Sequence, residues 1–223
     1  MDKKLFAQAI VKFLLGLLLT GALLFLPAGS FAYWQAWLFL GILFIPMFVA
    51  GLVMMAKNPE LLRKRLNARE QESEQKAVLA LSGLMFIAAF VLAGLNYRFG
   101  WIVLPFWVPI AGSVLFLGAY LLYAEVLREN IYLSRTIEVQ EGQKVIDTGL
   151  YGVVRHPMYM STLLLFLAMP VVLGSLISLA IMLFYIPIIA LRIRNEEKVL
   201  EDGLDGYKEY KKRVRKKLIP YIW

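Results

Sequence analysis

The chain has 223 residues, of which 60% are hydrophobic, and its formal net charge is +8. A soluble domain is typically about 45–50% apolar, so this composition indicates an integral membrane protein. The absence of cysteine excludes disulfides and a thiol nucleophile, and with His156 as the single histidine we expect no metal site. Basic residues commonly orient membrane helices, so the positive charge needs no nucleic-acid partner, and we expect none.

Charge-free runs locate the expected membrane spans, because about 20 helical residues cross a hydrocarbon core of about 30 Å. Runs of this length cover residues 13–32, 34–56, 77–97 and 99–124. Pro27 and Gly29 are expected to end the first helix. We therefore predict that residues 1–125 form N-terminal transmembrane helices with a cytoplasmic loop at 57–76. Within that loop, Asn58-Pro59-Glu60 has the residue types that start a helix, so we expect a short helix along the membrane surface.

A further charge-free run, residues 158–191, is too long for one simple span. It would extend about 50 Å as a single helix at about 1.5 Å per residue. Gly174-Ser175 lies at its middle, which predicts a tight hairpin of two short helices, neither of which spans the bilayer comfortably. The expected fold is therefore an all-α integral membrane protein with about five or six transmembrane helices, including a C-terminal helical hairpin.

The distribution of Lys and Arg sets the predicted orientation. Placing both termini in the cytoplasm leaves only Arg98, of 24 Lys/Arg residues, outside the cytoplasmic segments. The expected setting is the cytoplasmic membrane of a prokaryote. Near the end of the chain, Tyr207, Tyr210 and Val214 share one helical face, and lysines occupy the other. That pattern is typical of a helix lying in the membrane interface.

Two polar segments carry the candidate chemistry, and both adjoin the hairpin. One runs from Gln143 to Tyr159, and the other is Arg192-Ile193-Arg194-Asn195-Glu196-Glu197. A hairpin returns its two ends to the same face, so Arg155, His156 and Tyr159 are expected near Arg192 and Glu196. This predicts a mixed-charge cytoplasmic pocket in a catalytic region, residues 126–223, with a cofactor loop, the hairpin 158–191 and a basic cytoplasmic tail. Asn130 and Arg135 are possible residues of its edge. Taken alone, each of these side chains fits a helix anchor or a solvated helix surface at least as well as a catalytic role.

The order and spacing of these residues resemble the isoprenylcysteine carboxyl methyltransferase family, in the broad sense that includes bacterial, archaeal and phospholipid methyltransferases. The resembling pattern is Gly149-x-Tyr151-x-x-x-Arg155-His156-Pro157-x-Tyr159, an apolar hairpin, Arg192-x-x-x-Glu196-Glu197-x-x-Leu200, and Gly206-Tyr207-x-x-Tyr210. The resemblance covers about the last 90 residues. It implies S-adenosyl-L-methionine as methyl donor. By position, it implies that the cofactor contacts Gln143, Lys144, Val145, Ile146, Tyr151, His156, Pro157, Tyr159 and Glu196.

The resemblance also implies that Arg192 and Glu196 serve catalysis, with Arg192 on the substrate side. An acceptor carboxylate is already ionised at neutral pH and needs no general base, and the planar fork of Arg192 suits such a group. The expected acceptor is lipid-linked or apolar, with a prenylcysteine-like carboxylate as one example. Two alternatives stay open: a membrane reductase of the sterol-reductase type using a nicotinamide cofactor, and a non-enzymatic scaffold. The sequence leaves the oligomeric state unknown.

Overall fold

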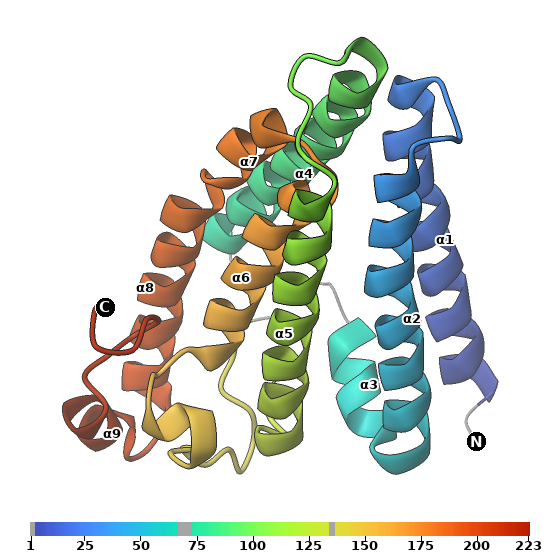
Figure 1. The fold of residues 1–223 in the computed structure, drawn as a ribbon. Helices are drawn as coiled ribbons and strands as arrows, with labels where there is room; N and C mark the ends of the chain where they lie inside the picture. Colours follow the sequence, from blue (N-terminus) through green and yellow to red (C-terminus); the bar gives the residue numbers. More distant parts are fainter. Residues whose placement is uncertain (1–2, 67–72, 134–136) are drawn as a thin grey trace.

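The computed structural model describes residues 3–66, 73–133 and 137–223, and this part of the chain contains helices and no strand (Figure 1). In chain order the helices are α1 (Lys3–Ala28), α2 (Trp34–Lys57), α3 (Pro59–Leu66), α4 (Ser73–Phe99), α5 (Trp107–Glu129), the short 3-10 helix η1 (Gly149–Gly152), α6 (Pro157–Val172), α7 (Leu176–Met182), α8 (Tyr185–Gly203) and α9 (Tyr207–Arg213). Among the described residues, five helical segments are long and apolar enough to cross a membrane: Lys4–Ala28, Trp34–Lys57, Ala80–Phe99, Trp107–Glu129 and Leu176–Gly203. The prediction of an all-α membrane protein is confirmed.

Local signals account for the helix ends in the first half of the chain. The first helix ends at Ala28, and Gly29 follows in a left-handed conformation with φ of 63°. The side chain of Asn58 accepts a hydrogen bond from the Leu61 amide at 3.1 Å and so caps α3, as its sequence predicted. In addition, one face of α3 packs against the bundle. Its Leu62 is buried against residues of α1 and α2, which bind the helix to the bundle.

Two boundaries in this half differ from the prediction. The fourth span begins at Trp107 rather than at Phe99, because Gly100 takes a φ of 62° and Pro105 precedes the helix. At the other end of α4, the helix already begins at Ser73, inside the predicted loop 57–76. Residues 67–72 of that loop lie outside the described residues.

The predicted hairpin is present, but its second arm is longer than expected. The first arm, α6, has 16 residues and ends at Val172, and Gly174 turns the chain with a φ of 69°. The second arm comprises α7 and α8, which together form a 28-residue segment from Leu176 to Gly203 that contains an apolar stretch long enough to cross a membrane. By length and composition this arm can cross a membrane, which corrects the expectation that neither arm would span comfortably. The charge-free run underestimates the length of this arm, because the helix continues through the charged residues after Leu191.

Buried hydrogen bonds fix the tip of the hairpin inside the bundle. The Tyr33 hydroxyl donates to the Leu173 carbonyl at 2.6 Å, and the Ser178 hydroxyl donates to the Ala89 carbonyl at 2.7 Å. Along the first arm, α6 packs closely on α5. At their contact, a β-carbon on Gly112 would lie 2.9 Å from a methyl carbon of Val171, so only glycine permits this approach. These contacts set the height and rotation of α6, which carries Tyr159.

Helix α9 and η1 lie at the same end of the bundle as α3 and the end of α5 (Figure 1). The pattern of α9 predicted that its apolar face would lie in the membrane interface, but in the structure this face packs against protein. Tyr207 and Tyr210 are 4% and 2% exposed and pack against Val139, Val145 and Leu200. The helix therefore covers the loop that the sequence assigned to the cofactor.

Candidate functional site

A pocket opens at this end of the bundle, between the loop that follows α5, the start of α6, the charged part of α8, and α9. Counting the open solvent at its mouth, it has an empty volume of about 860 Å³. Its lining residues are Asn130, Tyr132, Leu133, Ile137, Glu138, Gln143, Lys144, Val145, Ile146, Tyr151, Arg155, His156, Met158, Tyr159, Arg192, Glu196, Leu200, Leu204, Tyr207 and Tyr210. The set contains every predicted site residue except Pro157, which is buried as the first residue of α6.

The two polar segments meet through a short chain of hydrogen bonds. The Tyr159 hydroxyl donates to the Glu196 carboxylate, and the Arg192 Nε donates to the same hydroxyl at 3.0 Å. Arg192 and Glu196 are four residues apart on α8 and therefore share a face of the helix. Tyr159, which is 4% exposed, thus connects a carboxylate to a guanidinium at the base of the pocket.

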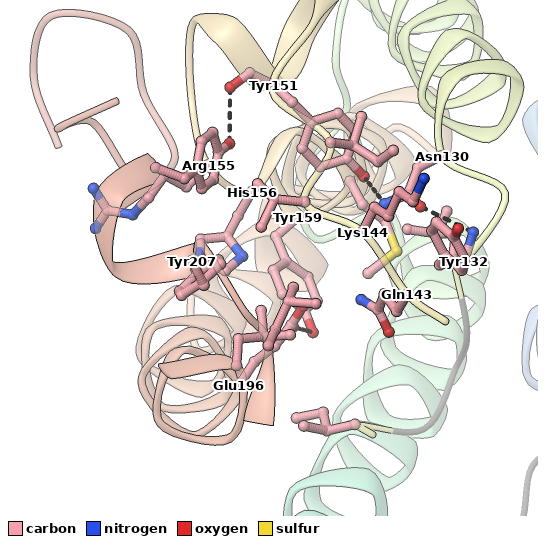
Figure 2. A pocket seen from close by; sticks show the side chains of 18 of the residues that line it. Asn130, Tyr132, Gln143, Lys144, Tyr151, Arg155, His156, Tyr159, Glu196 and Tyr207 are labelled. Carbon is pink, nitrogen blue, oxygen red and sulfur yellow. Dashed lines mark hydrogen bonds between the residues drawn. The ribbon is translucent and has the colours of Figure 1, made fainter. Parts of the chain in front are cut away.

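Glu197 belongs to a different, buried cluster. Its carboxylate lies 2.7 Å from Arg155 and 3.3 Å from the His156 ring, and all three side chains are at most 5% exposed. Lys217 and Lys211 approach the other carboxylate oxygen at 3.4 and 3.5 Å. Figure 2 shows the guanidinium of Arg155 turned away from the cavity. The adjacent acids therefore differ: Glu196 faces the pocket, whereas Glu197 supports its wall.

The loop across the cavity is held by side chains from both of its ends. Figure 2 shows Gln143, Lys144 and Tyr132 facing Tyr159, His156 and Glu196 across the open space. The Asn130 amide donates to the Tyr151 hydroxyl at 2.9 Å, which holds the residue that starts the loop against η1. Arg135, the other expected residue of the pocket edge, lies outside the described residues.

Glu129, the last residue of α5, secures the far end of the loop. Its carboxylate accepts hydrogen bonds from the Thr148 hydroxyl at 2.8 Å and from the Leu150 amide at 3.2 Å. Gly149, between them, has a φ of 51°, and a β-carbon there would overlap this carboxylate. The glycine of the motif is thus required by both backbone conformation and space.

The Tyr207 hydroxyl is a buried polar group that makes no hydrogen bond within the described part of the chain. Buried polar atoms are nearly always paired, so this hydroxyl, which belongs to a residue that lines the cavity, is a candidate partner for a ligand atom or water. Burial, and next the charge of Glu197, raise the pKa of Tyr207 well above its ordinary value. The hydroxyl therefore stays protonated at neutral pH and can donate to a ligand.

Sequence reasoning missed several lining residues. Tyr132 and Glu138 belong to no motif, and their place in the wall depends on the path of a loop without regular structure. Tyr207 was expected on a membrane-facing surface, because the spacing of Tyr207 and Tyr210 fits a face that meets lipid and a face packed against protein equally well.

Comparisons with known proteins match the part of the chain that contributes most of the lining of this pocket. Residues 105–202 match the isoprenylcysteine carboxyl methyltransferase (ICMT) family. The match begins just before α5 and runs almost to the end of α8, so it contains both polar segments. The chain is also similar to the Delta(14)-sterol reductase TM7SF2 of Mus musculus, with 32% identity over 91 residues. That similarity covers 40% of this chain but only 22% of the reductase.

Proposed function

From the match of residues 105–202 to the isoprenylcysteine carboxyl methyltransferase family, we propose that this chain is a membrane methyltransferase that uses S-adenosyl-L-methionine. The acceptor in this proposal is lipid-linked or apolar. The observation that carries the proposal is the hydrogen-bonded chain from Glu196 through Tyr159 to Arg192, which joins both motif segments at the base of one pocket.

The chemistry of the pocket fits this cofactor. S-Adenosyl-L-methionine would supply a methyl group on a positively charged sulfur, and it also carries an ammonium group. The carboxylates of Glu196 and Glu138 complement those charges, and the unpaired Tyr207 hydroxyl offers a donor to the ligand. Gln143, Lys144, Val145 and Ile146 would line one side of the cofactor, with Tyr151, His156 and Tyr159 opposite. Pro157 would act indirectly, by starting the helix that carries Tyr159.

Arg192 is the residue we assign to the acceptor. Its guanidinium can hold a carboxylate by two parallel hydrogen bonds, and its bond to Tyr159 fixes its position. A carboxylate acceptor is already ionised, so alignment of its oxygen with the methyl carbon is the main requirement. An amine or thiol acceptor would first have to lose a proton, and Glu196 is then the nearest candidate base.

The test uses S-adenosylmethionine with a labelled methyl group and a panel of acceptors: a prenylated cysteine carboxylate, a phospholipid amine and a fatty acid. Arg192→Ala should lower methyl transfer by about 10²–10³-fold while cofactor binding persists. Arg194→Ala is the matched control, because Arg194 lies two residues away on the exposed side of α8. Equal activity of the two variants would contradict the role of Arg192.

A second candidate is a membrane reductase with a nicotinamide cofactor, which the similarity to the mouse sterol reductase favours over a non-enzymatic scaffold. The same pocket and the Tyr207 hydroxyl would then face a nicotinamide nucleotide. Binding of NADPH, together with absent binding of S-adenosylmethionine, would support this candidate. The proposed setting for either enzyme is the cytoplasmic membrane of a prokaryote, with both termini in the cytoplasm.

A further inference from the structure

Residues 214–223 form a compact hook that returns from α9 along the side of α8 (Figure 1). The amides of Leu218 and Ile219 both donate to the Trp223 carbonyl at 2.8 Å, which closes the hook on itself. Leu218 is 2% exposed and belongs to the main core of the bundle. The hook is therefore a fixed part of the fold.

The outer side of the hook is apolar and aromatic. Tyr221 is 91% exposed, Ile222 74% and Trp223 40%. The neighbouring α8 also presents large apolar side chains outward, among them Ile186 and Leu191. In a membrane protein such side chains face lipid, and tyrosine and tryptophan prefer the level of the headgroups. The outer side of the hook thus suits the membrane interface.

The approach to the hook is strongly basic. Residues 208–217 contain seven Lys or Arg and a single acid, Glu209. Lys212 and Arg215 are exposed. Cations close to apolar and aromatic side chains form a two-part anchor, in which anionic headgroups attract the charges and the acyl region accepts the apolar groups. Each Lys or Arg near an anionic surface raises binding by roughly fivefold.

The hook is also bonded to the wall of the pocket. The Arg155 amide donates to the Lys216 carbonyl and the His156 amide to the Lys217 carbonyl, both at 2.9 Å. The Arg155 side chain donates to the Val214 carbonyl at 2.7 Å. Any force that holds the hook in place therefore holds the backbone of two pocket residues.

From these contacts we propose that residues 214–223 anchor the protein to the interface of an anionic lipid bilayer and thereby stabilise the Arg155–His156 wall of the pocket. The anchor requires no particular ligand in the pocket. The proposed anchor is therefore tested independently of the proposed methyltransferase activity.

The chain contains no cysteine, so a single introduced cysteine can be labelled without interference. Nitroxide labels are attached to Tyr221→Cys and to Lys208→Cys in vesicles of phosphatidylcholine and phosphatidylglycerol. For each label we measure the ratio of its collision rate with oxygen to its collision rate with a water-soluble nickel chelate. This ratio should be several-fold higher at position 221 than at position 208. Lys208 is the control because it is exposed on α9. Ile222→Cys repeats the measurement at a second position. Equal ratios at positions 221, 222 and 208 would overturn the anchor.

Hydrogen exchange tests the link to the pocket. In anionic vesicles, the amides of Arg155 and His156 should exchange several-fold more slowly than in vesicles of phosphatidylcholine alone. The double variant Lys212→Gln/Arg215→Gln should remove most of this difference, because it removes exposed cations and leaves the backbone bonds intact. Exchange that is the same in both lipids would overturn the proposed stabilisation. Neither measurement depends on methyl transfer or on a bound cofactor.

Discussion

Replacement of Glu197 by glutamine should destabilise the protein strongly, although the side chain changes little in size. The variant leaves the guanidinium of Arg155 and the ring of His156, both at most 4% exposed, without the charge that lies 2.7 and 3.3 Å away. Lys211 and Lys217 are 37% and 30% exposed, so water compensates them and they add little to the loss.

The expected cost follows from the burial of the pair. Removal of one partner from a buried ion pair costs about 3–5 kcal/mol, because a charge remains buried without compensation. For a chain of this size, 1 kcal/mol corresponds to a shift of about 2–4 °C in Tm, so Glu197→Gln should lower Tm by about 6–20 °C. Thermal unfolding of the detergent-purified protein, followed by circular dichroism, measures this shift.

Glu196→Gln is the matched control, since it makes the same change one residue earlier. Its side chain lies at the pocket, and a glutamine oxygen can still accept the bond from Tyr159. We expect a loss of at most about 1 kcal/mol, typical of one altered hydrogen bond. A Tm that falls equally in both variants, or more in Glu196→Gln, would refute the division of roles between the two acids.

Three further substitutions test how the fold supports the pocket. Gly149→Ala should cost about 1–2 kcal/mol for the left-handed backbone alone, and it should also displace the Glu129 carboxylate. Proteolysis of the loop should therefore be faster than in the wild type, and an unchanged rate of proteolysis would contradict the displacement. Gly112→Val should lower the free energy of unfolding by about 1–3 kcal/mol through overpacking between α5 and α6. Gly118→Val is its control, because no atom lies within 4 Å of a β-carbon there, and equal Tm values would count against the close contact. Leu218→Ala should cost about 2–5 kcal/mol, as for other buried leucines, and an unchanged Tm would show that the hook is not packed in the core.

Much of the architecture could be predicted because membrane spans have a simple signature. Charge-free runs located α1, α2, α4 and the hairpin, and Gly174 marked its turn. The signature fails where a helix leaves the apolar region, since α8 continues to Gly203 through charged residues. It also fails for short helices, because an apolar face meets lipid and protein equally well. The inward packing of α9 could not be read from its sequence for this reason.

The site could be predicted in part, because a hairpin necessarily returns its ends to the same face. That argument brought Tyr159 together with Arg192 and Glu196, as the structure has them. It could not separate Glu196 from Glu197, because adjacent residues on a helix point about 100° apart and the environment of each depends on tertiary packing. The environment of Glu197 is created by Arg155 and by the distant Lys217, which sequence spacing does not relate.

Calorimetric titration of S-adenosylmethionine, its demethylated product and NADPH into the purified protein tests the central claim most directly. We expect saturable binding of both adenosyl ligands, about tenfold weaker in Tyr207→Phe, since one hydrogen bond to a ligand is worth about 1.4 kcal/mol. Tyr210→Phe is the control, because its hydroxyl already donates to the Tyr151 carbonyl at 2.8 Å. Absence of adenosyl binding in folded protein, with saturable binding of NADPH, would contradict the methyltransferase assignment and favour the reductase.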